Sequence, residues 1–466
     1  MESLMTLSIG LPLAVAVGLA LPVLLRLAYS SITVGLVIVL ATFFMEVVYV
    51  AFPGYWVGIY LYPGDLVFTF LAVVALWRVL FAKDVPGRSP LWFAFGAVIA
   101  LSFVLGLQQF GKAAGTDFRN YFYVWGSTLY FMSFKLDEAR VTQIIKTWLV
   151  FTGLLIMLAG LRWIAEYLDM PIAASWRGTA TAEGVAEFRV LPSGAALFFV
   201  DSLMILTYIL TTRAAKRWVW MSVPLLIGII LVLQHRSVWI AAAASLVALY
   251  VAFPGKVRMK ITQYAVAAVF LVGAPAVVLT AYGKLDRLMD SVSTSAVTAT
   301  DFERGTVGGR IYGWGQLLQQ MQPADYIVGK PFGSGYERYE FPNVRWKATW
   351  DPHNFYLQTL LRGGVIGLAL LLAVYFVTMR RLLADKNVSG RLYLPPRLVF
   401  VLLVAQLAYM AAYHFPYQQS IWLGLAISVV ASMRRLDRET TRQKINDAIR
   451  GPAAPALNGL GGFVRR

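Results

Sequence analysis

The sequence predicts an all-α protein that crosses a membrane many times, and two observations carry this prediction. The first is composition. Of 466 residues, 59% are hydrophobic and 14% are charged, with a mean hydropathy of +0.65. Soluble domains usually have about 45–50% apolar and about 25% charged residues. The second is that apolar runs of about 20 residues, the length that crosses a bilayer, recur along the whole chain. So much apolar surface cannot be buried in one water-soluble core, which excludes a soluble enzyme, a DNA-binding protein and a disordered protein.

Thirteen segments are apolar enough to cross the bilayer. Their backbones must be helical, because lipid offers no hydrogen-bond partners. The first segment follows MESLM, which carries no positive charge, so we expect it to be retained rather than cleaved as a signal. The predicted number of transmembrane helices is thirteen with this segment and twelve without it. The segments are 4–25, 32–52, 66–81, 91–107, 118–134, 144–165, 191–210, 219–233, 238–253, 264–282, 360–379, 398–413 and 421–433.

Lysine and arginine are concentrated in alternate short loops, and this predicts the orientation of the chain. The basic loops lie at 83–88, 135–146, 213–217, 256–260 and 380–397, and a basic tail follows residue 434. The positive-inside rule makes these parts cytoplasmic. The loops 53–64, 106–117, 166–190, 283–352 and 414–419, and the turn at 235–236, then face the outside, which is the periplasm of a Gram-negative cell. The same rule accounts for the net charge of +17, so we expect membrane lipid and no nucleic acid as a partner.

The segments and loops divide the chain into four expected regions. These are an N-terminal transmembrane bundle (1–282), a large periplasmic loop domain (283–352), C-terminal transmembrane helices (353–434) and a basic cytoplasmic tail (435–466). The loop domain is rich in glycine and aromatic residues and is expected to act as a lid over a site at the membrane surface. The chain has no cysteine, which excludes disulfides, Fe–S clusters and thiolate zinc sites.

Four arginines, Arg119, Arg189, Arg236 and Arg310, fall at the outer face. The positive-inside rule disfavours arginine there, so these residues need an explanation. Arg236 lies in VLQHRSVWI, between two apolar segments with almost no loop, and we interpret it as functional; the alternative is a snorkelling interfacial arginine. Arg310 lies in GTVGGRIYGWG, where glycines let backbone amides approach an anion, although no Walker pattern follows; the alternative is a flexible turn. For Arg189, in EFRVLPSG, the alternative is a solvated loop charge.

His353 lies in WDPHNFYLQTLLRGGVIG, directly after an Asp-Pro pair that favours the start of a helix. We expect His353 in the first helical turn, where the helix dipole would lower its pKa and leave a neutral imidazole that can act as a general base. The alternative is a capping or interface histidine. His235 and His414 also fall at the outer face, and we interpret both as structural.

Carboxylates in the outer loops are scattered, and none forms the acidic pair that metal-dependent lipid-linked glycosyltransferases carry in their early outer loops. The sequence therefore requires no metal and no cofactor. Glu46 and Asp201 lie inside apolar segments. We expect each to have a hydrogen-bonded structural role, with proton coupling as the alternative.

Three features, in this order along the chain, resemble the O-antigen ligase/polymerase superfamily of bacterial membrane glycosyltransferases. A membrane hairpin turns at an arginine followed by a small residue and Trp (HRSVW). A large outer loop carries an arginine with a Trp four residues later (RIYGW). That loop closes on His-Asn before a helix, with two glycines about ten residues further on. The resemblance spans roughly residues 189–367 and the topology. His235 departs from it, because the family usually has Ser or Thr there.

The resemblance implies a GT-C-like bundle in the bacterial inner membrane and an O-antigen ligase activity. Its members move a polysaccharide from undecaprenyl pyrophosphate to the lipid A-core oligosaccharide at the periplasmic face. Arg236, Arg310 and Arg189 would then bind the leaving pyrophosphate in place of a metal, and His353 would accept the proton of the acceptor hydroxyl. The further candidates for the site are Asn354, His235, Arg119, Tyr312 and Trp314.

Two other functions stay open. One is an O-antigen polymerase or a protein O-oligosaccharyltransferase of the same superfamily, since the shared motifs do not separate these activities. The other is a transporter or flippase for lipid-linked glycans. A transporter needs charged or broken helices at the bilayer midplane, whereas the apolar segments here are mostly uninterrupted and the polar residues gather at one surface.

Overall fold

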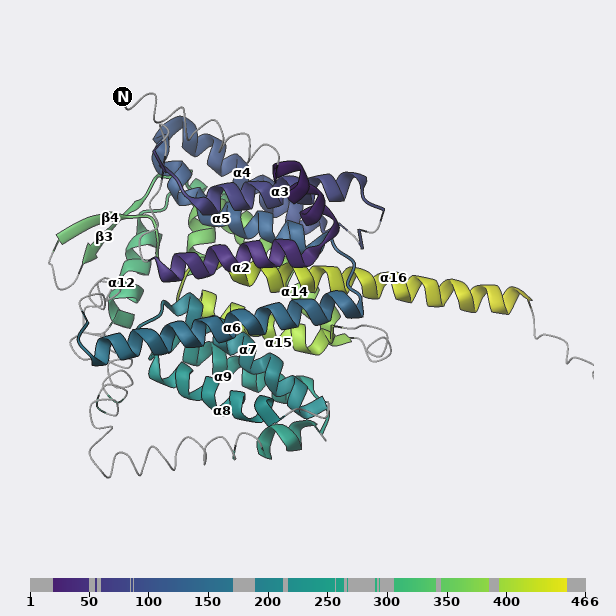
Figure 1. The fold of residues 1–466 in the computed structure, drawn as a ribbon. Coiled ribbons are helices and arrows are strands. Elements are labelled where there is room, and N and C mark those ends of the chain that lie inside the picture. Colours follow the sequence, from purple (N-terminus) through teal and green to yellow (C-terminus); the bar gives the residue numbers. More distant parts are fainter. Residues whose placement is uncertain are drawn as a thin grey trace, which may run out of the picture.

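A computed structural model describes residues 20–450, apart from 50–54, 57–59, 84, 87, 171–188, 213–216, 256, 264–265, 267–289, 291–292, 294–305, 341–344 and 385–393. Helices dominate these residues, and most of them lie side by side in one bundle (Figure 1). Helix α12 and the strands β3 and β4 lie at one end of the bundle, while the last part of α16 extends beyond the other end. The all-α prediction is therefore confirmed, with two short hairpins added.

The first half of the chain runs through six helices and one hairpin. Helix α1 meets α2 at a bend of 113°, and Gly111, with a φ of +53°, is the single residue between α4 and α5. The expected outer loop at 106–117 is thus wrong, because helix continues through most of it. The elements are α1 (Ala20–Ser30), α2 (Ile32–Val48), β1 (Tyr55–Trp56), β2 (Tyr60–Leu61), α3 (Pro63–Phe81), α4 (Pro90–Phe110), α5 (Lys112–Met132) and α6 (Glu138–Tyr167).

The second half adds the helices that carry the candidate site. Several helices of the fold (α3, α4, α13 and α15) begin with proline, which lacks the N–H that would stay unsatisfied in a first turn. The strands β3 and β4 form an antiparallel hairpin in which Tyr336 pairs with Thr349. The elements are α7 (Ser193–Thr212), α8 (Arg217–Val232), α9 (Arg236–Ala252), α12 (Thr306–Gln319), α13 (Pro323–Val328), β3 (Tyr336–Glu340), β4 (Arg345–Thr349), α14 (Phe355–Ala384), α15 (Pro396–Met410), η2 (Tyr417–Gln419) and α16 (Ser420–Arg450).

Among the described residues, five helices are long and apolar enough to cross a membrane, namely α3, α4, α6, α7 and α14. The bent pair of α1 and α2 makes a sixth if it is one span, and α8, α9 and α15 are shorter apolar helices. The chain is therefore a multi-pass all-α membrane protein. The count of twelve or thirteen spans stays a prediction, because the expected segments 4–25 and 264–282 lie mostly outside the described residues.

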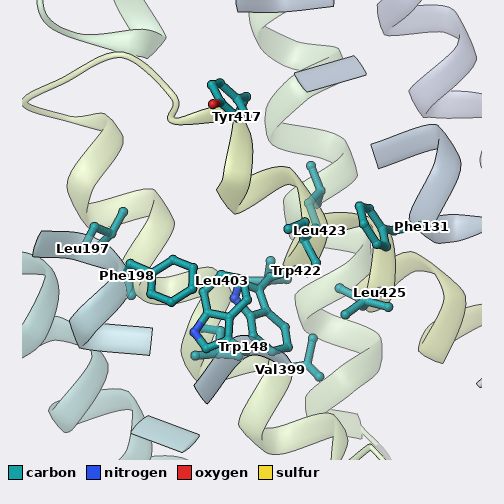
Figure 2. Packing of buried hydrophobic residues seen from close by; sticks show 14 of the residues in the cluster. Phe131, Trp148, Leu197, Phe198, Val399, Leu403, Tyr417, Trp422, Leu423 and Leu425 are labelled. Atoms are coloured by element: carbon teal, nitrogen blue, oxygen red, sulfur yellow. The ribbon is translucent and has the colours of Figure 1, made fainter. Parts of the chain in front are cut away.

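The core of the bundle is built from stacked aromatic rings. Trp148 of α6 stacks on Phe198 of α7 with ring centroids 3.9 Å apart, and Trp422 of α16 lies 4.7 Å from Trp148 (Figure 2). The indole N–H of Trp148 donates to the hydroxyl of Ser202 at 3.1 Å, which satisfies its only polar group. Since lipid tails are as apolar as these rings, close packing rather than expulsion of water stabilises the helix contacts.

The two acidic residues expected inside apolar segments are both hydrogen-bonded. Tyr417 donates its hydroxyl to Glu46 at 2.8 Å, and Gln419 donates its amide to Asp201 at 2.6 Å. Both donors belong to the 3₁₀-turn η2, which leads into α16. Glu46 and Asp201 thus hold this turn to α2 and α7.

A buried ion pair fixes the segment 329–335 against the bundle. Arg362 of α14 and Asp117 of α5 lie 2.8 Å apart, and their side chains are 0% and 3% exposed. Arg362 also donates to the carbonyl of Pro331 and the hydroxyl of Ser334, and Asp117 accepts from the backbone N–H of Gly333 at 3.0 Å. Removing one partner of such a pair usually costs about 3–5 kcal/mol, because a buried charge stays uncompensated.

Helix α14 is broken at Gly364, where φ is +60° and ψ is −166°. The short helix α13 packs against this break, and a Cβ atom added at Gly364 would overlap the carbonyl oxygen of Ile327. Gly367, one turn later, differs because a Cβ atom there would meet Val98 at an ordinary 3.6 Å. The backbone conformation therefore requires glycine at position 364 but not at position 367.

We expect Gly364→Ala to prevent correct folding, because alanine is strained at this φ and its methyl group would displace α13. The matched variant Gly367→Ala should be tolerated. The measurement is the yield of monodisperse protein in detergent and its midpoint of thermal unfolding. Equal yields and midpoints for the two variants would show that α13 does not lie against this break.

Candidate functional site

Five segments that are far apart in the sequence meet near one end of the bundle. They are the chain just before α7 with Arg189, the start of α9 with Arg236, α12 with Arg310, the residues 351–354 before α14, and the residues 411–414 after α15. The three arginines expected to act together are therefore neighbours in space. We refer to Arg189, Arg236 and Arg310 as the arginine cluster.

Backbone carbonyl groups hold two guanidinium groups of the arginine cluster in place. Arg189 donates to the carbonyl of Gln234 at 3.0 Å, and Arg310 donates to the carbonyl of Ala412 at 2.9 Å. Arg236 is the first residue of α9 and lies near enough for the charges of Arg189 and Arg310 to act on it. Gln234 has a φ of +53°, so its backbone adopts the left-handed conformation that turns its carbonyl toward Arg189.

The arginine cluster concentrates positive charge. Burial lowers the pKa of Arg189, and the charge of Arg310 lowers it further, while Tyr413 raises it. Among the described residues, no carboxylate forms an ion pair with Arg189 or Arg310, and the buried Nε of Arg189 has no hydrogen-bond partner. Cations held together in this way favour a multivalent anion between them.

The glycine-rich stretch that carries Arg310 is a helix and not an open loop. The helix α12 begins at Thr306 and includes TVGGRIYGWG. Gly313 lies against the side chain of Arg338, with a distance of 3.0 Å between an added Cβ and its Cδ. The small residue thus gives room for close packing, and Arg310 is presented from a rigid element.

Tyr413 connects the arginine cluster to the histidine, and the sequence analysis did not single it out. Its ring lies under the guanidinium of Arg310 at 4.8 Å and 6.1 Å from the ring of His353. Its carbonyl accepts from the backbone N–H of Phe355 at 3.2 Å. Its position at the end of the apolar segment 398–413, next to the predicted outer loop that begins at His414, was the available signal.

His353 lies two residues before α14, so its expected position in the first helical turn is wrong. Its φ of +52° is left-handed, and Asn354 caps the helix instead, with its side-chain oxygen accepting from the backbone N–H groups of Tyr356 and Leu357. The argument from the helix dipole therefore does not apply to His353. The left-handed turn instead directs its backbone N–H to the carboxylate of Asp351 at 2.7 Å.

Asp351 lies between two imidazole rings. Its Oδ2 is 3.3 Å from Nδ1 of His353 and 3.8 Å from Nδ1 of His414. Burial on its own would raise the pKa of Asp351, but the contacts with His353 and His414 lower it below the ordinary value of an aspartate. A carboxylate on Nδ1 orients an imidazole and leaves Nε2 for a substrate, so Asp351 is a second site residue that the sequence analysis left among scattered acids.

His235 borders the arginine cluster, but its hydrogen bond to the backbone and its lowered pKa make it unsuited to acid–base catalysis. Its Nε2 lies 2.8 Å from the carbonyl oxygen of Leu191. Burial lowers the pKa of His235 to about 4, and the charge of Arg189 adds to this effect. The imidazole is therefore neutral at physiological pH and fixes the turn before α9.

The lowered pKa of His235 has a consequence for stability. Folding favours the neutral ring, so its contribution is present above about pH 6.5 and is lost as the pH falls toward about 4. We expect the thermal midpoint of the protein to fall across this range, and less steeply in His235→Gln, which can keep the bond to Leu191. Identical slopes for the two proteins would contradict a buried neutral His235.

The remaining candidates do not join the arginine cluster. Arg119 forms an ion pair with Asp65 at 2.8 Å and lies over the ring of Tyr62. Trp314 donates its indole N–H to the carbonyl of Pro352 at 2.7 Å, which ties α12 to the segment before His353. The side chain of Tyr312 is exposed. Among the described residues, no group of three His, Asp or Glu side chains is arranged to hold a metal ion.

The fold and the site define a multi-pass membrane protein with a cluster of arginines beside an imidazole–carboxylate group. Residues 220–372, about a third of the chain, match the family model described as O-antigen ligase. This match contains Arg236, Arg310, His353 and Asn354, and it confirms the resemblance to the O-antigen ligase/polymerase superfamily. The family indicates a glycosyltransferase-like enzyme that acts on a lipid-linked glycan and an acceptor. No curated protein matches the chain.

Proposed function

We propose that the protein is an O-antigen ligase that moves a polysaccharide from undecaprenyl pyrophosphate to the lipid A-core oligosaccharide. The observation that supports this most directly is the meeting of Arg189, Arg236 and Arg310 beside His353. A pyrophosphate is the kind of multivalent anion that guanidinium groups bind through paired hydrogen bonds. The match to the O-antigen ligase family supports a lipid-linked glycan as the donor.

The reaction balances with the residues of this site. The acceptor hydroxyl attacks the anomeric carbon of the donor sugar, the new C–O bond forms, and the bond from that carbon to the pyrophosphate oxygen breaks. The electron pair of the broken bond passes to the undecaprenyl pyrophosphate, where the arginine cluster stabilises the developing charge. The hydroxyl proton passes to the imidazole of His353, whose Nδ1 faces Asp351 at 3.3 Å.

The orientation of the chain fits this proposal. The site lies near the end of the bundle that carries α12 and the β3–β4 hairpin, and the last part of α16 extends beyond the opposite end (Figure 1). With the basic tail in the cytoplasm, as the positive-inside rule predicts, the site faces the periplasm of a bacterial inner membrane. The undecaprenyl chain then lies along the lipid-facing surface of the bundle.

The test is reconstitution of the purified protein in proteoliposomes with an undecaprenyl-pyrophosphate-linked glycan and lipid A-core. We expect transfer without added metal, at an equal rate in EDTA, because guanidinium groups carry the leaving-group charge. Loss of transfer in EDTA and recovery with Mg²⁺ would rule out this mechanism. Extension of the lipid-linked glycan itself, or transfer to a protein, would instead identify a polymerase or a protein O-oligosaccharyltransferase. Movement of the lipid across the bilayer without transfer would identify a flippase.

A further inference from the structure

A cavity of about 530 Å³ borders the candidate site at Asp351 and His414. It is lined by residues of five segments, and none of the three clustered arginines contributes to it. Its volume falls within the range of about 300–1,000 Å³ that is typical of small-molecule sites. The lining residues used below include Glu46, Asp117, Trp350, Asp351, Gln358 and His414.

A second cavity of about 700 Å³ adjoins the first, because Glu46, Arg119 and Tyr123 line both. The rest of its wall is mostly apolar and includes Ile38 and Met45 of α2. The side chain of Met45 is 39% exposed, so this cavity reaches the outer surface of the bundle. We refer to these two neighbouring cavities, which lie between the surface of α2 and Asp351 and His414, as the passage.

The charge around this passage is opposite to that of the arginine cluster. Four carboxylates, Glu46, Asp65, Asp117 and Asp351, lie in or beside its wall, against the two guanidinium groups of Arg119 and Arg362. Each guanidinium group pairs with one carboxylate, Arg119 with Asp65 and Arg362 with Asp117, so the remaining negative charge of the wall comes from Glu46 and Asp351. The passage therefore disfavours an anion, whereas the arginine cluster attracts one.

Two polar atoms in the first cavity are placed to bind hydroxyl groups. Gln358 is 6% exposed, and its Oε1 is buried without a hydrogen-bond partner among the described residues. Such an orphaned acceptor is costly unless a ligand supplies a donor. His414 directs Nδ1 toward Asp351, which leaves Nε2 for a ligand. The ring of Trp350, which is 45% exposed and also lines this cavity, offers an apolar face for a sugar ring.

We propose that this passage is the acceptor site, and that it takes a sugar ring without negative charge, either neutral or amine-bearing, whose hydroxyl groups bind Gln358 and Nε2 of His414. The acceptor role rests on the proposed function, while the sugar class rests on the cavity. Donor and acceptor then meet at Asp351 and its two imidazoles. The separation of charge keeps the pyrophosphate out of the acceptor site.

Photo-crosslinking tests the site without requiring turnover. The full-length protein in nanodiscs is treated with three glycosides that carry the same diazirine aglycone: a glucoside, a glucosaminide and a glucuronide. We expect the first two to label peptides containing Glu46, His414 or residues 350–358 about tenfold more than the glucuronide does, because like charges repel in a partly buried site. Equal labelling by the glucuronide, or labelling confined to peptides of Arg189, Arg236 and Arg310, would overturn the proposal.

Matched variants separate the role of charge from the role of folding. Glu46→Gln keeps the size of the side chain and should raise glucuronide labelling relative to glucosaminide labelling by several fold, since one like charge is removed from the wall. Glu337→Gln, an exposed carboxylate on β3 outside the cavities, should leave the ratio unchanged. His414→Gln should weaken labelling by all three probes. An unchanged ratio in Glu46→Gln would contradict the assigned sugar class.

The same three glycosides, offered as acceptors with a lipid-linked donor, distinguish the two proposals. Transfer to the neutral and amine-bearing sugars, with little to the glucuronide, supports both. Labelling of the cavity without transfer to any acceptor would remove the acceptor role together with the proposed ligase function. Transfer that favours the glucuronide would leave a glycosyltransferase and overturn only the acceptor specificity.

Discussion

Replacing Arg310 with alanine is expected to lower the rate of glycan transfer by about 10²–10³-fold, the usual cost of removing one preorganised donor that stabilises developing charge. Arg310 is suited to this role because the carbonyl of Ala412 and the ring of Tyr413 fix its guanidinium. The effect should fall on kcat more than on KM for the donor, since the leaving pyrophosphate gains charge only as the bond breaks. The measurement is initial transfer rate in proteoliposomes over a range of donor concentrations.

The control for Arg310 is an arginine held in the same way but elsewhere in the fold. Arg258 donates to the carbonyl groups of Phe253 and Val251 and lies 5.5 Å from the centroid of the Tyr250 ring. Arg258→Ala should leave transfer nearly unchanged. Arg310→Lys refines the result, because lysine keeps the charge and loses the planar fork. Full activity in Arg310→Lys would show that charge alone matters, and full activity in Arg310→Ala would contradict the role of the cluster.

Replacing His353 with asparagine is expected to reduce transfer by about 10²–10⁴-fold, the usual contribution of a positioned general base. Asparagine is the informative choice, because it tolerates the left-handed backbone of position 353 better than alanine does. The fold and the backbone hydrogen bond to Asp351 should then survive, and only the imidazole is lost. The measurement is the pH profile of kcat, in which the limb that reports the base should disappear.

Two controls accompany His353→Asn. Asp169 is another non-glycine residue with a left-handed φ, +48°, and it follows α6. Asp169→Asn should change neither the rate nor the thermal midpoint. His353→Asn should match the thermal midpoint of the native protein within a few degrees. A normal transfer rate and pH profile in His353→Asn would show that another group accepts the proton.

The bundle could be predicted from the sequence because membrane helices leave a strong local signal. Apolar runs of the right length and the bias of Lys and Arg toward alternate loops depend on nearby residues only. The positions at which helices break or end were harder to predict from the sequence. The turn at Gly111 was predicted as a loop of twelve residues, because Lys112 and Asp117 read as polar, although Asp117 is paired with Arg362 of a distant helix. A pairing of that kind has no local signature.

The charged residues of the candidate site could be predicted from the sequence, but their arrangement in space could not. Arg189, Arg236, Arg310 and His353 stood out because arginine is disfavoured at an outer face and because His-Asn follows a proline. The sequence did not reveal that Tyr413 lies between Arg310 and His353. Nor did it show that Asp351 contacts two histidines 61 positions apart. These contacts arise from the packing of α9, α12, α14 and α15, which no local pattern encodes.

The way the segment 329–335 is held has a consequence for building chimeras from related proteins. Phe332 packs directly over Gly106 of α4, and Gly333 is bound by Asp117 of α5. The segment 329–335 is thus packed closely against neighbouring membrane helices, and it cannot be exchanged on its own. A graft of this segment would have to include Gly106, Asp117 and Arg362. A change in acceptor specificity would therefore require the transfer of part of the helix bundle as well.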